Sequence, residues 1–266
     1  PVLAVGDKDS LNYLYSESYY AKAYTDLNKL FRYDSSTGYY SFDSSLNFAT
    51  INPDGNGSYD KNFTLYDKPN TGTSSGSTGH PYFIPFNDYG TNESGANYHF
   101  GMKITAEFAM PKDGQVNGSD MIFSFTGDDD VWVYIDGVLI LDMGGIHDSC
   151  SGSINFAEGT VTANKVYGII DESGNSIDRT ENQSETAYIG DLLYTAYKDN
   201  QKYIDANLEL RNDGHWYLKD YMSHNFSFFY LERGAVDSNC QIEFNLYTLQ
   251  RNSLNVSKTL DTYTSE

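Results

Sequence analysis

The sequence predicts an all-β fold, and three observations indicate it. The chain has 266 residues, of which 24 are Tyr and 15 are Phe, and aromatic residues favour strands. Its 23 Gly suit many turns. Several short segments alternate apolar and polar residues, which is the period of a half-buried strand. The length is sufficient for one large β domain whose core needs no disulfide framework.

The predicted strands can be placed individually. In the clearest one every second residue from Phe100 to Phe108 is apolar, so one face is expected in the core. Asp136-Gly137 is a dipeptide strongly preferred in two-residue hairpin turns, and it is expected to join two strands. We therefore interpret Asp136 as a turn residue rather than a metal ligand. The segments predicted as strands are 39–42, 100–108, 121–125, 131–135, 138–141, 225–231 and 240–249.

The remaining segments are predicted to be helices, loops and insertions outside these strands. A weakly periodic helix is predicted at 14–30, and residues 68–80 have the composition of a surface loop. Residues 160–215 are interpreted as a helical and loop insertion over the sheet, with a helix at 185–198. Residues 1–249 are expected to form a single domain. Residues 250–266 are expected to be a linker or the first strand of a following domain.

Charge narrows the class of partner. The chain carries 17 basic and 37 acidic residues, a net charge of -20. This balance argues against nucleic acid or an anionic membrane as a partner. No apolar run is long enough to span a bilayer, and no signal peptide is recognisable. Because the chain begins at Pro1 rather than Met, we expect it to be a piece of a longer protein.

Three successive carboxylates, Asp128, Asp129 and Asp130, stand directly before a predicted buried hairpin. Like charges held side by side repel, so a calcium ion is the first candidate to compensate them. The alternative is that they cap a strand in solvent. Neighbouring strand residues point to opposite faces, so the ion could be held by residues 128 and 129 or by 129 and 130. The spacing does not fit the calcium loop of an EF-hand.

The segment from Thr126 to His147 closely resembles the core of fibro-slime domains. These are relatives of the fourteen-kilodalton domain of protective antigen, a β-sandwich found in adhesins, glycosidases and toxins. The resemblance covers roughly residues 30–249, with strong motifs at 121–159 and 224–246. It implies an antiparallel β-sandwich of the protective-antigen type with loop and short helical insertions.

The resemblance also implies a set of metal ligands. In lectin members of this family, two adjacent Asp residues joined by a cis peptide hold a calcium ion that binds glycan hydroxyls, and a second loop completes the site. The Asp pair falls here on Asp128 and Asp129, and the second loop, at 234–239, offers Asp237 and Asn239. Asp130 and the Gly-Gly-Ile-His extension depart from the pattern of the yeast flocculins.

Other residues are candidates for ligand contact. Asp130 is the remaining carboxylate of the run, and Trp216 could stack on a sugar ring. His147 follows a glycine pair and could either join the site or only fix its loop by a hydrogen bond. If the two loops converge, a disulfide between Cys150 and Cys240 could connect them. The alternative is two separate buried thiols.

These observations lead to one expected function. We expect a calcium-dependent adhesive module, without catalytic activity, in an extracellular, cell-wall-anchored protein. The expected partner is a glycan or a host surface glycoprotein, alongside further domains of the same surface protein. The alternative is a structural or host-protein-binding module in which calcium is purely structural.

Overall fold

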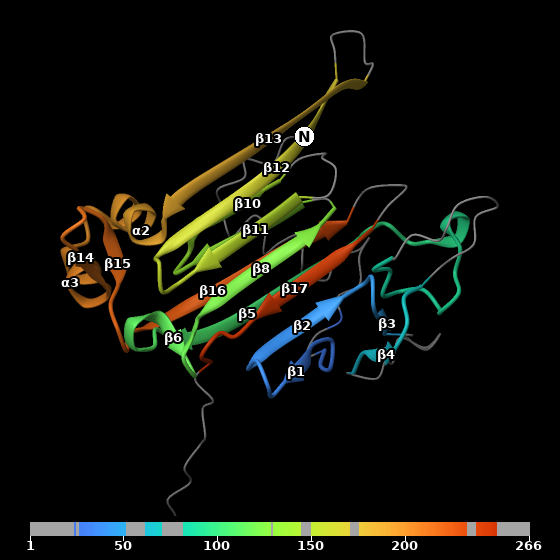
Figure 1. Cartoon of the computed structure of the whole chain (residues 1–266), viewed down its shortest axis with the longest axis horizontal. Helices are drawn as coiled ribbons and strands as arrows, with labels where there is room; N and C mark the ends of the chain where they lie inside the picture. Colours follow the sequence, from blue (N-terminus) through green and yellow to red (C-terminus); the bar gives the residue numbers. More distant parts are fainter. Residues whose placement is uncertain are drawn as a thin grey trace, which may run out of the picture.

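Two antiparallel β-sheets form the body of the protein (Figure 1). The computed structural model describes residues 24, 27–51, 62–70, 82–128, 130–144, 150–170, 176–232 and 238–248. The seven-stranded sheet has the order β1-β2-β17-β8-β11-β12-β13, and the four-stranded sheet has the order β10-β9-β16-β5. The expected β-sandwich architecture is confirmed.

The strands of the larger sheet are β1 (Arg32–Asp34), β2 (Tyr39–Asp43), β8 (Ile122–Gly127), β11 (Cys150–Asn155), β12 (Thr160–Ile170), β13 (Ser176–Tyr188) and β17 (Cys240–Phe244). Those of the smaller sheet are β5 (Phe100–Ala109), β9 (Asp130–Ile135), β10 (Val138–Met143) and β16 (Ser223–Glu232). Short two-stranded sheets join β3 (Phe48–Thr50) to β4 (Thr64–Tyr66) and β6 (Gln115–Val116) to β7 (Ser119–Asp120), and two 3-10 turns cover Glu93–Gly95 and Lys112–Gly114.

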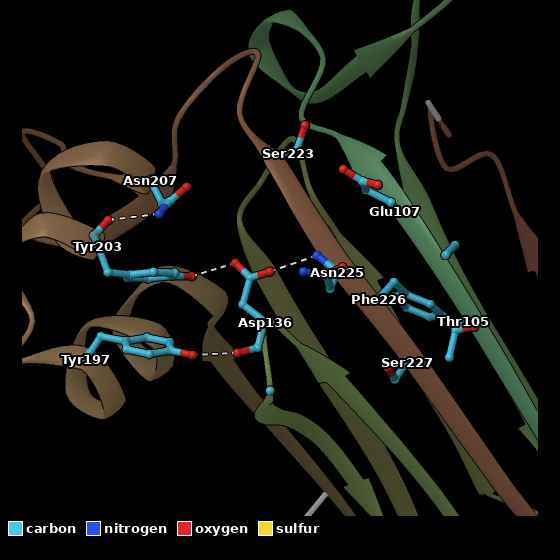
Figure 2. A pocket seen from close by; sticks show the side chains of 12 residues that line it. Thr105, Glu107, Asp136, Tyr197, Tyr203, Asn207, Ser223, Asn225, Phe226 and Ser227 are labelled. Carbon is cyan, nitrogen blue, oxygen red and sulfur yellow. Dashed lines mark hydrogen bonds between the residues drawn. The ribbon is translucent and has the colours of Figure 1, made fainter. Parts of the chain in front are cut away.

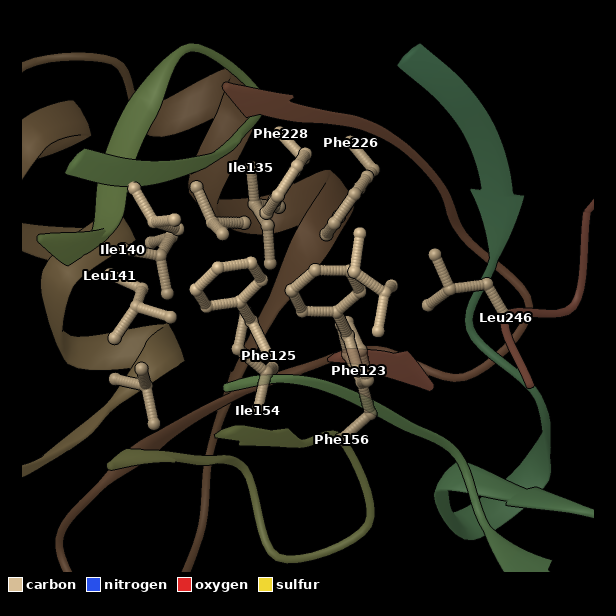
Figure 3. Packing of buried hydrophobic residues seen from close by; sticks show 14 of the residues in the cluster. Phe123, Phe125, Ile135, Ile140, Leu141, Ile154, Phe156, Phe226, Phe228 and Leu246 are labelled. Atoms are coloured by element: carbon tan, nitrogen blue, oxygen red, sulfur yellow. The ribbon is translucent and has the colours of Figure 1, made fainter. Parts of the chain in front are cut away.

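The core lies between the two large sheets and is dominated by phenylalanine (Figure 3). Phe123 of β8 meets Phe226 of β16 with ring centroids 5.0 Å apart, and Phe125 meets Phe228 at 5.8 Å. All four side chains are buried. Burying one such side chain stabilises the fold by about 1.5–3 kcal/mol. Alternating Phe residues in β8 and β16 therefore hold the two sheets together.

Strand β9 of the smaller sheet is buried on both faces. Val131 and Val133 of β9 face the main core, whereas Trp132 and Tyr134 pack with Phe229 on the opposite face. This is the division of faces that strand parity predicts. The β9–β10 turn has φ of 49° at Asp136 and 84° at Gly137, as expected for a two-residue hairpin.

The insertion is shorter than predicted. Thr160–Ile170 and Ser176–Tyr188 form the paired strands β12 and β13, which extend the seven-stranded sheet, so the assignment of these residues to a helical insertion is wrong. The helix expected at 185–198 is confirmed as α2 (Ile189–Tyr197). It is followed by α3 (Gln201–Asn207) and the strands β14 (Leu208–Leu210) and β15 (Trp216–Leu218). The side chain of Asn200 caps α3 by accepting a hydrogen bond from the Tyr203 N–H at 3.1 Å.

Some sequence predictions fall largely on residues outside the described ranges. These are most of the helix predicted at 14–30, most of the loop at 68–80 and all of residues 250–266. Among the described residues, no helix has the length and apolar character needed to cross a membrane.

Candidate functional site

Two loops far apart in sequence meet at one end of the sandwich. Asp128 directly follows β8, and Asn239 directly precedes β17. These strands pair antiparallel, with Cys240 opposite Gly127, so the end of one strand lies beside the start of the other. The amide Nδ2 of Asn239 donates a hydrogen bond to Oδ2 of Asp128. The backbone N–H of Asp128 donates to the carbonyl of Asn239 at 3.3 Å.

Gly127 makes this close approach possible. A Cβ atom at this position would lie 2.4 Å from the carbonyl oxygen of Asn239 and 2.7 Å from the ring of Phe125. Real Cβ atoms do not approach backbone that closely, so only glycine fits. The Gly-Asp dipeptide at 127–128 therefore positions the carboxylate against the second loop.

Acidic side chains are buried around this junction. Asp128 is 9% exposed, Asp130 at the start of β9 is 2% exposed, and Glu232 at the end of β16 is 1% exposed. The hydroxyl of Tyr230 donates to Oε2 of Glu232 at 2.8 Å. Burial, together with the negative charge of Glu232, raises the pKa of Tyr230 well above its ordinary value. Three carboxylates gathered at one end of the sandwich make the local potential negative, which favours a cation there.

The donor set fits calcium, which prefers carboxylate, carbonyl and amide oxygens. Of the four predicted ligands, the structure places Asp128 and Asn239 in contact, while Asp129 and Asp237 lie outside the described residues. In the described part of the chain no three Asp, Glu, His or Cys side chains converge on one point. Asn239 turns its nitrogen toward Asp128. Coordination by its oxygen therefore requires the amide to rotate.

The other residues predicted to contact a ligand, Asp130, Trp216 and His147, do not lie together in the described structure. Asp130 lies beside the junction, opposite Leu231 in the sheet. Trp216 lies on the insertion at the other end of the sandwich, where its ring stacks on Tyr194 with centroids 4.5 Å apart (Figure 1). Trp216 therefore does not lie beside Asp128 and Asn239, and its contact with a sugar stays a prediction. His147 lies outside the described residues.

The predicted disulfide is not formed. Cys150 and Cys240 are buried thiols, and each lies opposite Gly127 on one of the two strands that flank β8. Their Cα atoms are thus two strand spacings apart, about 9–10 Å. A disulfide requires a Cα separation of about 4.4–6.8 Å. The strand order, which places β8 between the two cysteines, prevents the bond.

A second polar cluster lies at the opposite end of β9 (Figure 2). It was not predicted from the sequence. Asp136, in the β9–β10 turn, accepts hydrogen bonds from the hydroxyl of Tyr203, from Nδ1 of His224 and from the backbone N–H of Asn225, each at 2.7 Å. Its backbone carbonyl accepts from the hydroxyl of Tyr197 at 2.5 Å. One turn therefore holds α2, α3 and β16 together.

The pKa shifts of Asp136, Tyr197 and Tyr203 identify the acceptor and two donors of this cluster. Burial of Asp136 opposes its ionisation, but the hydrogen bonds and charge of His224 and the bonds from Asn225 and Tyr203 outweigh it and lower the pKa. Burial and the neighbouring carboxylate raise the pKa of Tyr203 and of Tyr197. The carboxylate is therefore the acceptor and both hydroxyls are donors. The sequence marked Asp136 as a turn residue, but no pattern connected it to partners more than sixty residues away.

Comparison with known proteins agrees with the architecture. Residues 54–172 match the PA14 domain, a range that includes Asp128 but ends before Asn239. Protein psiP of Dictyostelium discoideum is 40% identical over 77 residues, which is 29% of this chain and 9% of psiP. Protein psiC is 46% identical over 61 residues (23% and 10%), and psiD is 41% identical over 73 residues (27% and 13%).

The matched segment thus spans only 9% to 13% of the length of these three relatives. No solved structure matches the chain significantly. The chain therefore carries a PA14 domain, whose antiparallel β fold it shows, and it is homologous to the psi proteins of Dictyostelium.

Proposed function

We propose that this protein is a calcium-dependent adhesive module that binds carbohydrate. The observation that carries the proposal is the contact between Asp128 and Asn239, which joins the two oxygen-rich loops at one end of the sandwich. Asp128 and the neighbouring buried carboxylates Asp130 and Glu232 add negative charge there. The PA14 match supports a binding module, because such domains often serve in carbohydrate binding or adhesion.

Asp128, Asp129, Asp237 and Asn239 would hold the ion. Calcium, when bound, supplies open coordination positions that sugar hydroxyl oxygens can fill. The loops would orient the sugar, while the net charge of -20 disfavours anionic polymers. The proposal is of a binding module rather than an enzyme.

We place this module in an extracellular, cell-surface protein of the fibro-slime group, attached to the cell wall through other parts of the protein. The motifs at 121–159 and 224–246 support this context. A glycan or a surface glycoprotein is the proposed partner, together with further domains of the same surface protein. The names of the psi proteins identify no ligand, so the choice of glycan is left to experiment.

A glycan array in buffers containing either calcium or EDTA tests the proposal. The wild-type protein is expected to bind a subset of neutral glycans only with calcium, and Asp128→Ala is expected to abolish that binding. Asp199→Ala, at an exposed aspartate between α2 and α3, is the matched control and should bind like wild type. If glycan binding is unchanged by EDTA, or if no glycan binds, the proposal is wrong. Stabilisation by calcium without any glycan binding would favour the structural alternative.

A further inference from the structure

We infer that the protein has a second carbohydrate site, independent of calcium, in a groove between the helical insertion and the outer face of the four-stranded sheet. The groove has a volume of about 700 Å³, and Asp136 is one of the residues that line it (Figure 2). Asp136 directly follows β9, whereas Asp128 lies before its first residue. Pockets of about 300–1,000 Å³ are typical of small-molecule sites. This inference does not rest on the calcium site.

The floor of the groove is a hydrogen-bonding surface. On neighbouring strands, Ser227 lies opposite Thr105 and Asn225 lies opposite Glu107, so these four side chains share the outer face of β16 and β5. Ser227 is 3% exposed, and it is one of the residues that line the groove. A ligand hydroxyl in the groove would therefore meet a hydroxyl that can both donate and accept a hydrogen bond.

The wall of the groove is aromatic and rigid. Tyr197 and Tyr203 stack with ring centroids 3.9 Å apart, and both line the groove. Their hydroxyls are occupied by Asp136, as Figure 2 shows, so the rings offer apolar surface rather than donors. Asp136 also accepts hydrogen bonds from β16, so the helices that carry the two tyrosines are fixed relative to the sheet before any ligand binds. Such preorganisation reduces the entropy lost on binding.

The charge of the lining selects the ligand class. Among the described residues that line the groove, two are acidic, Asp136 and Glu107, and none is basic. Anionic ligands such as phosphates and acidic sugars are therefore disfavoured. Hydroxyl and amide groups below, with aromatic surface at the side, match the polar edges and apolar faces of a sugar ring. A neutral oligosaccharide fits this combination best.

The test uses neutral trisaccharides of glucose, galactose, mannose and N-acetylglucosamine in the presence of EDTA, followed by calorimetry and saturation-transfer NMR. At least one trisaccharide is expected to bind. Thr105→Arg, which places a long side chain in the groove from an exposed position, should weaken that binding at least tenfold. Ser227→Ala should weaken it about three- to tenfold through the loss of one hydrogen bond.

Thr195→Arg is the matched control. Thr195 is exposed on α2 and stands two residues before Tyr197, so it faces away from the groove. This variant should bind like wild type and carries the same added charge. If no trisaccharide binds in EDTA, or if Thr105→Arg and Ser227→Ala both bind as well as wild type, the inference is wrong. Binding of a lysine-rich peptide but of no trisaccharide would also overturn it.

The two proposals can fail separately. The calcium proposal is tested by the glycan binding that EDTA removes and that Asp128→Ala abolishes. The groove is tested by the trisaccharide binding that persists in EDTA and that Thr105→Arg weakens at least tenfold. Asp128→Ala should therefore leave trisaccharide binding in EDTA unchanged.

Discussion

Asn239 donates its side-chain amide hydrogen bond to the carboxylate of Asp128 across 111 residues of sequence. The contact exists because β8 and β17 are antiparallel neighbours in the larger sheet. It brings together the first and last of the four residues nominated as calcium ligands.

Calcium should raise the melting temperature of the protein. A ligand that binds only the folded state stabilises it by about 2.7 kcal/mol at a free concentration one hundred times its dissociation constant. Differential scanning fluorimetry after EDTA treatment and calcium titration measures the effect. Asp128→Ala should remove the shift, and Asn239→Ala should move it to higher calcium concentrations. An equal shift in Asp128→Ala would contradict the assigned ligands.

Gly127→Ala should destabilise the protein and weaken calcium binding together. The added methyl group would lie 2.4 Å from the carbonyl of Asn239, so the second loop must move. Forcing extra volume into a packed site typically costs about 1–3 kcal/mol. Urea unfolding and calcium titration give the two quantities. Gly95→Ala is the control, because its added methyl group meets only side-chain atoms, at 3.4 Å or more. Unchanged calcium affinity in Gly127→Ala would show that the loop tolerates displacement.

Tyr203→Phe should detach α3 from the sheet. The variant keeps the ring but removes the hydroxyl that donates to the carboxylate of Asp136. Hydrogen bonds to charged groups contribute about 1.5–3 kcal/mol, and urea unfolding measures this loss. Tyr194→Phe should change the free energy of unfolding by less than about 0.5 kcal/mol, because Tyr194 is an exposed helix residue. Equal stability of the two variants would refute the assigned role of Tyr203.

The Asp136 cluster should also make stability depend on acid pH. Burial opposes ionisation of Asp136, but His224, Asn225 and Tyr203 lower its pKa below the ordinary value of 3.8. A group with a lowered folded-state pKa contributes stability above the unfolded value and loses it as the pH falls through the folded value. The contribution is therefore complete at neutral pH and declines below about pH 3.8.

The free energy of unfolding, followed by urea titration from neutral pH to below that value, measures this dependence. Asp136→Asn should be less stable at neutral pH and should show a smaller decline with acid, because its side chain cannot ionise. Asparagine also tolerates the positive φ of the turn, so the backbone conformation is retained. An identical acid decline in both proteins would assign the dependence to other carboxylates.

Several strands of the sandwich were predictable because their signals are local. Alternation located β5, and Asp136-Gly137 located the β9–β10 hairpin. β12 and β13 were missed because they gave no comparably clear local signal, and their pairing became evident only in the fold. The cysteine pair was misjudged for a related reason, since its separation depends on which strand lies between.

The sequence by itself determined the all-β class, the core face of β5, the hairpin turn and the acidic run at 128–130. Each follows from residues that are neighbours along the chain. Only the tertiary structure decided that Asn239 meets Asp128, that β8 separates the two cysteines and that Tyr197 and Tyr203 converge on Asp136. These contacts depend on strand order and register, which arise from packing over the whole core rather than from any single segment.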